Sequence, residues 1–74
     1  MLDYEELTRR WHQAIVRNNP MAWEAMSQWL GAEAVMASVD GLPELHESMT
    51  VLSNLAHRHA LDLYPQRELD EVAA

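Results

Sequence analysis

The chain has 74 residues, 49% of them apolar, and a formal net charge of −7 from twelve acidic residues against five arginines, with no lysine and no cysteine. This length indicates one domain, whose core alone supplies only about 3–5 kcal/mol. The missing cysteines exclude disulfides, thiolate metal sites and cysteine nucleophiles. The apolar content is too high for a disordered chain, and the acidity disfavours nucleic acids and anionic membranes as partners.

The first expected helix begins after Asp3 and ends near Arg17 or Asn18. Asp3 is a suitable N-cap, and Glu6 completes an Asp-x-x-Glu variant of the capping box. Apolar side chains recur at spacings of three and four along this segment, which places them on one helical face. The members of this face are Tyr4, Leu7, Trp11, Ala14 and Ile15.

The second expected helix follows at once, because Asn19 can cap it while Pro20 occupies its first turn. Two helices joined this closely should form an antiparallel hairpin. Gly31 either ends the second helix or lies inside it at a cost of about 1 kcal/mol relative to alanine. We expect the helix to continue to Val39, with an apolar stripe after Gly31 that is rotated relative to the stripe before it.

The third expected helix, Leu42 to Tyr64, is the element around which we expect the rest of the chain to be organised. Pro43 suits its first turn, and Pro65 disfavours helical geometry at the preceding residue. One face carries its apolar residues together with one histidine: Leu45, Met49, Leu52, Leu55, Ala56, His59 and Leu63. A polar stripe that should face water contains His46, Thr50, Ser53 and His57.

These patterns predict an all-α fold, a three-helix bundle in which the third helix covers the hairpin of residues 3–39. Residues 1–64 form the single domain, and residues 65–74 form an acidic tail that is either a frayed helix or disordered. The apolar inventory exceeds what so small a bundle can hide, so we expect a homodimer or an obligate complex. The apolar face of the third helix, Leu45 to Leu63 as given above, is the expected dimer seam.

Three tryptophans and five methionines in so short a chain favour contacts with another protein. The residues expected to bind such a partner are Trp23, Trp29, Val35 and Met36. The alternative is that all three indoles are simply core residues with satisfied N–H groups. Both interpretations fit the sequence equally well.

The sequence argues against catalysis and against a bound metal or cofactor. No serine lies in a nucleophile motif, and Gly31 and Gly41 are the only glycines, so no glycine-rich phosphate loop exists. His57 and His59 point about 200° apart on a helix, and His59 with Asp62 forms only one metal-type pair. We therefore expect no enzyme, no metal and no cofactor, although His59 at an interface could sense pH.

The expected function is that of a small acidic protein-binding regulator, such as an adaptor, a chaperone-like factor or an inhibitor, whose partner has a basic surface. The alternative is a dimeric DNA-associated regulator that uses Arg9, Arg10 and Arg17. No apolar run approaches the ~20 residues that span a bilayer, and the acidic N-terminus is unlike a signal peptide. A cytoplasmic location is the resulting expectation.

One segment is similar to a known repeat family. Tyr4 to Leu7, Trp11, Ala14-Ile15 and the Asn18-Asn19-Pro20 turn resemble the second helix and closing turn of a tetratricopeptide repeat. Met21 to Trp23 then resemble the start of a following repeat. The resemblance ends before Asp40-Gly41-Leu42-Pro43, and it implies a role in binding peptides or proteins.

Overall fold

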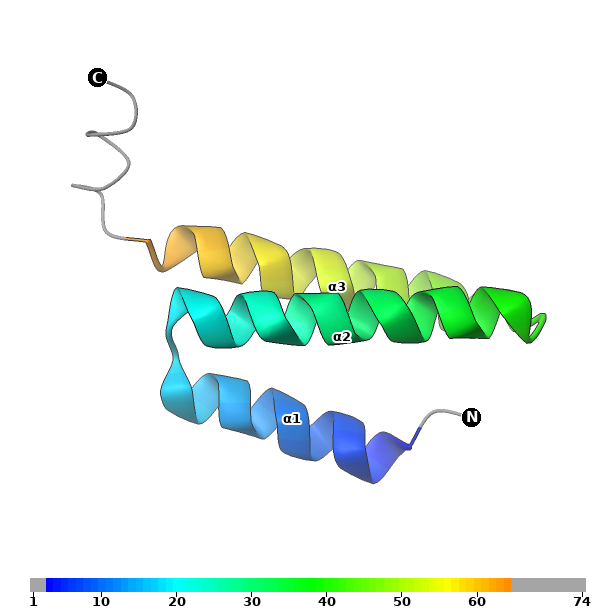
Figure 1. Cartoon of the computed structure of the whole chain (residues 1–74), viewed down its shortest axis with the longest axis horizontal. Helices are drawn as coiled ribbons and strands as arrows, with labels where there is room; N and C mark the ends of the chain where they lie inside the picture. The colour runs from blue at the N-terminus through cyan, green and yellow to red at the C-terminus, as the bar shows by residue number, and fades with distance from the viewer. Residues whose placement is uncertain (1–2, 65–74) are drawn as a thin grey trace, which may run out of the picture.

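The computed structural model describes residues 3–64, which contain three helices and no strand (Figure 1). Helix α1 spans Tyr4–Arg17, α2 spans Pro20–Val39 and α3 spans Pro43–Asp62. The three predicted helices and the tight α1–α2 link are therefore confirmed. The predicted acidic tail, residues 65–74, lies outside the described residues.

Side chains close to the first helix set its start. The Asp3 carboxylate accepts hydrogen bonds from the backbone N–H groups of Glu5 and Glu6, at 2.9 and 3.3 Å. These bonds satisfy two of the N–H groups that a helix start leaves without partners. The carboxylate of Glu6 turns instead to the guanidinium of Arg10, with Oε1 2.9 Å from Nη2. The N-cap is thus formed as predicted, with Glu6 making an ion pair along the helix.

Two neighbouring asparagines make the turn between α1 and α2. Asn18 adopts a left-handed backbone (φ 44°), which asparagine tolerates better than most residues, and its N–H donates to the carbonyl of Ala14. Asn19 is extended, and its side-chain oxygen accepts from the N–H of Ala22 at 2.8 Å. One asparagine ends α1 and the next begins α2, which makes the link so short.

Helix α2 continues through Gly31, as expected. A methyl group at Gly31 would lie 3.6 Å from the hydroxyl of Ser53 on α3, so the two helices approach closely here. The hydroxyl of Ser27 donates to the carbonyl of Ser53 at 2.9 Å, and the hydroxyl of Ser53 donates to the carbonyl of Ser27 at 2.8 Å. Small residues and this reciprocal pair of hydrogen bonds hold α2 and α3 together at mid-length.

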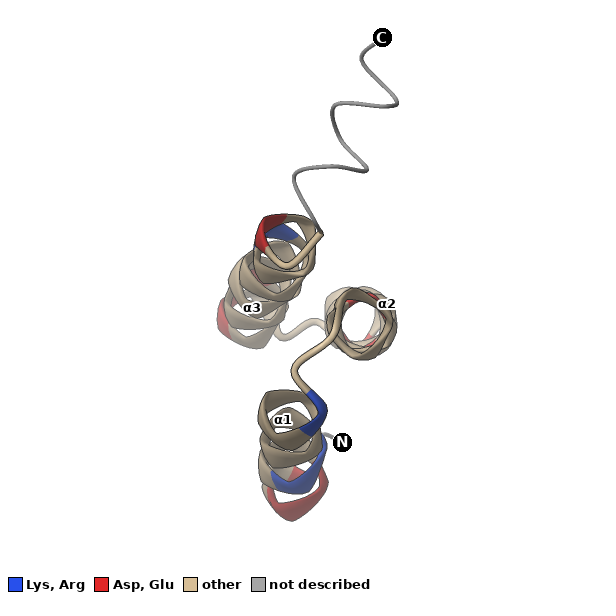
Figure 2. Ribbon diagram, turned by 90° about the vertical axis from the view of Figure 1, so that its left-hand side faces the viewer, with Lys and Arg blue, Asp and Glu red and all other residues tan. Residues whose placement is uncertain are grey.

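Helix α2 is the central element of the molecule, and the expectation that α3 has this place is wrong. Both α1 and α3 lie alongside α2, while no Cα atom of α1 lies within 8 Å of one of α3 (Figure 2). Helix α3 therefore covers α2 rather than the whole hairpin. The reason lies in the composition of α2, which has only Glu24 and Glu33 as charged residues in its 20 positions and can bury more than one side.

The buried core consists mainly of small side chains. Its members are Ala14, Trp23, Met26, Leu30, Ala34, Ala37, Met49, Ala56 and Ala60. Alanines allow the helices to approach closely, but each one buries little apolar area. Many larger apolar side chains of residues 3–64 consequently remain at the surface: Tyr4, Ile15, Val16, Met21, Val35, Met36, Val39, Leu42, Val51, Leu55, Leu61 and Tyr64.

Candidate protein-binding surface

The C-terminal half of α2 exposes a group of aliphatic side chains. Val35 is 60% exposed, Met36 55% and Val39 75%, whereas Ala34 and Ala37 on the opposite side are buried. Helix α1 starts at Tyr4, and the last turns of α2 extend past this start, so that among residues 3–64 only α3 lies beside them (Figure 1). The rotated stripe expected after Gly31 is therefore present and faces outward.

A groove of about 190 Å³ lies beside this stripe, between the end of α2 and the start of α3. We call it the distal groove, and its lining residues are Glu33, Met36, Ala37, Asp40, Leu42, Leu45 and Met49. Ala37 and Met49 are buried, while Met36 and Leu42 are exposed. The lining is aliphatic apart from two carboxylates, Glu33 and Asp40. Such a groove offers apolar contact flanked by negative charge.

The turn between α2 and α3, beside the distal groove, carries acidic residues and neither lysine nor arginine. The sequence has no lysine or arginine from Asn18 to Ala56. The acidic residues in the same stretch are Glu24, Glu33, Asp40, Glu44 and Glu47. The arginines of residues 3–64 lie on α1 and in the second half of α3. Negative potential is therefore concentrated around the turn that joins α2 to α3.

Trp23 lies in the core and is not on the surface where we expected partner contacts. It is 4% exposed, and its ring makes T-shaped contacts with the rings of Trp11 and His59, whose centroids lie 5.2 and 4.6 Å away. Its indole N–H points to the side-chain oxygen of Asn18 at 3.5 Å. These contacts join α1, α2 and α3 through one aromatic cluster, which explains why this indole is inside.

Trp29 is half-buried at the α1–α2 contact. The guanidinium of Arg10 lies over its ring, with Cζ 4.8 Å from the ring centroid. This cation–π contact fixes the middle of α1 against α2. Of the four residues predicted to bind a partner, Val35 and Met36 are therefore exposed side by side, Trp29 is half-covered by Arg10 and Trp23 is in the core.

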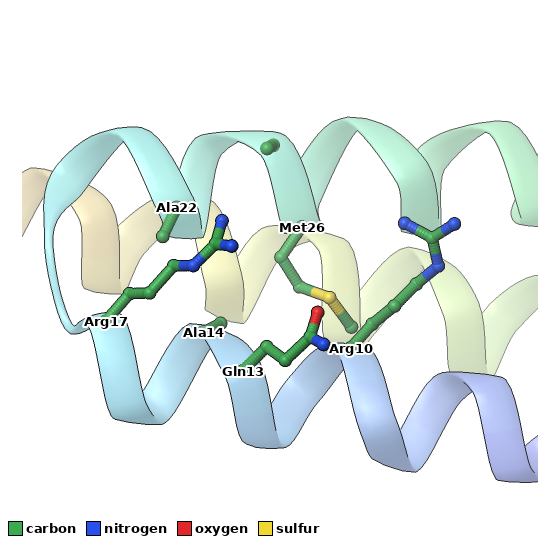
Figure 3. Close-up of a pocket in the computed structure, with 7 residues that line it drawn as sticks. Arg10, Gln13, Ala14, Arg17, Ala22 and Met26 are labelled. Carbon is green, nitrogen blue, oxygen red and sulfur yellow. The ribbon is translucent and has the colours of Figure 1, made fainter.

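A smaller cavity of about 110 Å³ lies between α1 and α2. Figure 3 shows the side chains of Arg10 and Arg17 reaching from α1 toward α2 on either side of Met26. Arg9 and Arg10 both approach the same Glu6 carboxylate, at 3.9 and 2.9 Å. That carboxylate offsets part of the positive charge, so the geometry adds no support to the DNA-associated alternative, which stays a prediction.

The face of α3 predicted as a dimer seam is mostly used within this chain. Met49 and Ala56 are buried, and Leu45, Leu52 and Leu63 are half-buried against the core of the same chain. His59 is exposed, and its ring makes a T-shaped contact with Trp23. Only Leu55, at 48% exposed, points away from α2. Most of the predicted seam residues therefore lie on the face of α3 that packs against α2, and the dimer itself stays a prediction.

The opposite side of α3 is also apolar. Val51, Leu55 and Leu61 are each about half exposed and line a shallow depression together with polar neighbours. Helix α3 thus has apolar residues on two opposite sides, and one of them has no covering helix among residues 3–64.

Three of the four residues in the polar stripe of α3 that we expected in water contact α2, while Thr50 is exposed and its hydroxyl donates to the carbonyl of His46 within α3. The Nδ1–H of His46 donates to the carbonyl of Ala34 at 2.7 Å. The Nδ1 atom of His57 lies 2.6 Å from the carboxylate of Glu24. Together with the Ser27–Ser53 pair, these contacts are polar links between α2 and α3. Within residues 3–64, no three histidine, aspartate or glutamate side chains come together as a metal site would require.

Sequence reasoning did not single out Glu33, Asp40 and Leu42 as part of a surface. Two signals for them were present in the sequence. Glu33, Met36 and Asp40 follow one another at spacings of three and four, which places them on one side of a helix. The absence of lysine and arginine from Asn18 to Ala56 also indicates that this side has a single sign of charge.

Comparisons with protein-family models, curated proteins and solved structures found no match for this chain. The tetratricopeptide resemblance therefore has no support from these comparisons. Among residues 3–64, no helix has the length and apolarity needed to cross a bilayer. Any function must consequently be argued from the surface described above.

Proposed function

We propose that this chain is a small acidic regulator that acts by binding another protein, without catalysis of its own. The observation that carries the proposal is the exposure of Val35, Met36 and Val39 on one side of α2, beside the distal groove. Clustered exposed aliphatic side chains are typical of sites where proteins meet proteins. Methionine adds adaptability to such a site because its side chain is flexible and polarisable.

The negative charge of the chain supports the same proposal and indicates that the partner surface is basic. The acidic end of the chain would attract a basic surface and would repel nucleic-acid phosphates. A basic partner surface agrees with the net charge of −7. An adaptor, a chaperone-like factor or an inhibitor would each use such a surface, and all three are binding roles.

The proposal is tested by affinity capture with two matched variants. Val35→Asp introduces a carboxylate into the proposed surface, and Val16→Asp introduces the same group at an exposed position of α1, where Val16 is 70% exposed. A stoichiometric partner should be captured by the wild-type chain and by Val16→Asp, and should be lost with Val35→Asp. Equal capture by both variants, or no stoichiometric partner at all, would count against the proposal.

A homodimer is part of the proposal, with a different seam from the one that the sequence suggested. Since Leu45, Met49 and Ala56 pack in the core of the same chain, we expect a second copy to use the outer side of α3, around Val51 and Leu55. Sedimentation should then show a dimer at micromolar concentration, and Leu55→Asp should convert it to a monomer. A wild-type chain that sediments as a monomer at that concentration would exclude the dimer.

A further inference from the structure

We propose that the distal groove binds an amphipathic helix of the partner protein, and that this helix carries lysine or arginine beside its apolar stripe. The inference rests on the proposed protein-binding function and deepens it. It names both the secondary structure and the charge of the segment that occupies the groove.

A helix is the indicated occupant because α1 already packs against the same side of α2. Ala22, Met26 and Trp29 contact or border α1, and Glu33, Met36 and Asp40 line the distal groove. These six positions follow one another at spacings of four and three, so they form one continuous row along α2. The groove is therefore the uncovered continuation of a surface on which a helix already lies.

The lengths of the helices show how much of the row remains open. Helix α1 has 14 residues and α2 has 20, so at 1.5 Å per residue they measure about 21 and 30 Å. Helix α1 starts at Tyr4, and the last turns of α2 extend past it (Figure 1). Roughly 9 Å of the row is left for another segment, with Leu45 and Met49 of α3 forming the second wall.

The charges at the groove select a basic helix. Glu33 and Asp40 are its only charged lining residues, and they lie seven residues apart, which is about 10 Å along α2. Two basic residues separated by two turns on the incoming helix would face these two carboxylates. Helix α1 offers an example in this chain, because Arg10 and Arg17, also seven residues apart, line its contact with α2 beside the buried Ala14.

The test uses a designed probe instead of the unidentified partner. A peptide of about 15 residues, long enough for four helical turns, is made from leucine, alanine and lysine with an amphipathic pattern. A second peptide has every lysine replaced by glutamate. Each is titrated at low salt into the full ¹⁵N-labelled chain, and amide chemical shifts map where it binds. We expect the lysine peptide to shift amides around Glu33, Met36 and Leu45, and the glutamate peptide to shift none of them.

Matched variants separate the groove from general attraction to an acidic protein. Asp40→Lys and Asp62→Lys make the same charge change at the groove and at the far end of α3. Met36→Glu and Met21→Glu make the same change at two exposed positions of α2, of which Met21 is 82% exposed. We expect Asp40→Lys and Met36→Glu to weaken lysine-peptide binding about tenfold. Asp62→Lys and Met21→Glu should change it by less than about twofold.

Several results would overturn the inference. Shifts that centre on Val51, Leu55 and Leu61, equal binding of the glutamate peptide, or equal effects of Asp40→Lys and Asp62→Lys would each do so. Groove amides that shift on dilution of the chain alone would show that a second copy occupies the groove. If the peptide fails while Val35→Asp still abolishes capture, the helix inference falls and the protein-binding proposal stands.

Discussion

The two glycines of this chain should respond in opposite directions to the same substitution. Gly31 lies inside α2 with helical geometry, and Gly41 lies in the turn before α3 with a positive φ of 72°. An added methyl group at Gly31 would meet the hydroxyl of Ser53 at 3.6 Å, an ordinary van der Waals contact. At Gly41 it would meet nothing within 4 Å. Packing is therefore nearly neutral at both positions, and backbone conformation decides the result.

Helix propensity gives the magnitude for Gly31→Ala. Alanine in a helix interior is about 1 kcal/mol more favourable than glycine, so the free energy of unfolding should rise by roughly 0.5–1 kcal/mol. Gly41→Ala forces an L-residue into left-handed geometry and should lower the free energy of unfolding by about 1–2 kcal/mol. In a domain of this size, 1 kcal/mol corresponds to roughly 4–8 °C in Tm.

Urea and thermal unfolding followed by far-UV circular dichroism measure both changes. Coincident transitions from ellipticity and tryptophan fluorescence would justify the two-state treatment that the free energies require. If Gly31→Ala were destabilising, α2 and α3 would have to lie closer together than the 3.6 Å contact implies. A neutral Gly41→Ala would show that the turn does not need the left-handed conformation.

Three further substitutions test the core, the α2–α3 contact and the N-cap of α1. Trp23→Ala should lower the free energy of unfolding by about 3–5 kcal/mol, and circular dichroism should show a largely unfolded chain. Trp29→Ala, at a half-buried site, should keep a cooperative unfolding transition. Equal losses of stability in the two variants would contradict the assignment of Trp23 to the core. Ser27→Ala removes a hydroxyl that donates to Ser53 and should cost about 1 kcal/mol in urea unfolding, so an unchanged midpoint would argue against that bond. Asp3→Ala should lower the free energy of unfolding by about 1 kcal/mol. Amide hydrogen exchange should become faster in α1 than in α2 and α3, because α1 packs against α2 alone. Equally faster exchange in all three helices would contradict this prediction.

The helix boundaries could be predicted from the sequence because they depend on residues close to each boundary. Asp3, Asn19 and Pro43 occupy the cap or first-turn positions that their side chains favour, and each marks a helix start in the structure. Gly31 was harder, since a helix can either stop at glycine or tolerate it. Its role becomes clear only when Ser53, 22 positions later in the sequence, is seen beside it.

The arrangement of the helices could not be predicted with the same success, because α3 is apolar on two opposite sides. Periodicity identifies the stripe that contains Leu45, Met49 and Ala56, but it does not say whether this stripe meets α2 or a second copy. Packing against α2 leaves Val51 and Leu55 on the outside. The dimer seam was assigned to the first stripe because of its width and the shortness of the chain, and most of this stripe packs against α2 within the chain.

Indole rings do not form the exposed apolar surface on which the partner proposal rests. Trp23 is enclosed by Trp11 and His59, and Trp29 is partly covered by Arg10, so indoles are not the main exposed apolar groups of this chain. The exposed large apolar side chains of residues 3–64 are mostly aliphatic, and four of them, Val35, Met36, Val39 and Leu42, lie near the C-terminal end of α2. An alanine-rich core leaves larger side chains outside, and at the distal groove these lie between two carboxylates. An excess of exposed apolar side chains alone would predict non-specific association. Apolar contact flanked by acidic groups instead favours a partner with basic residues at matching positions.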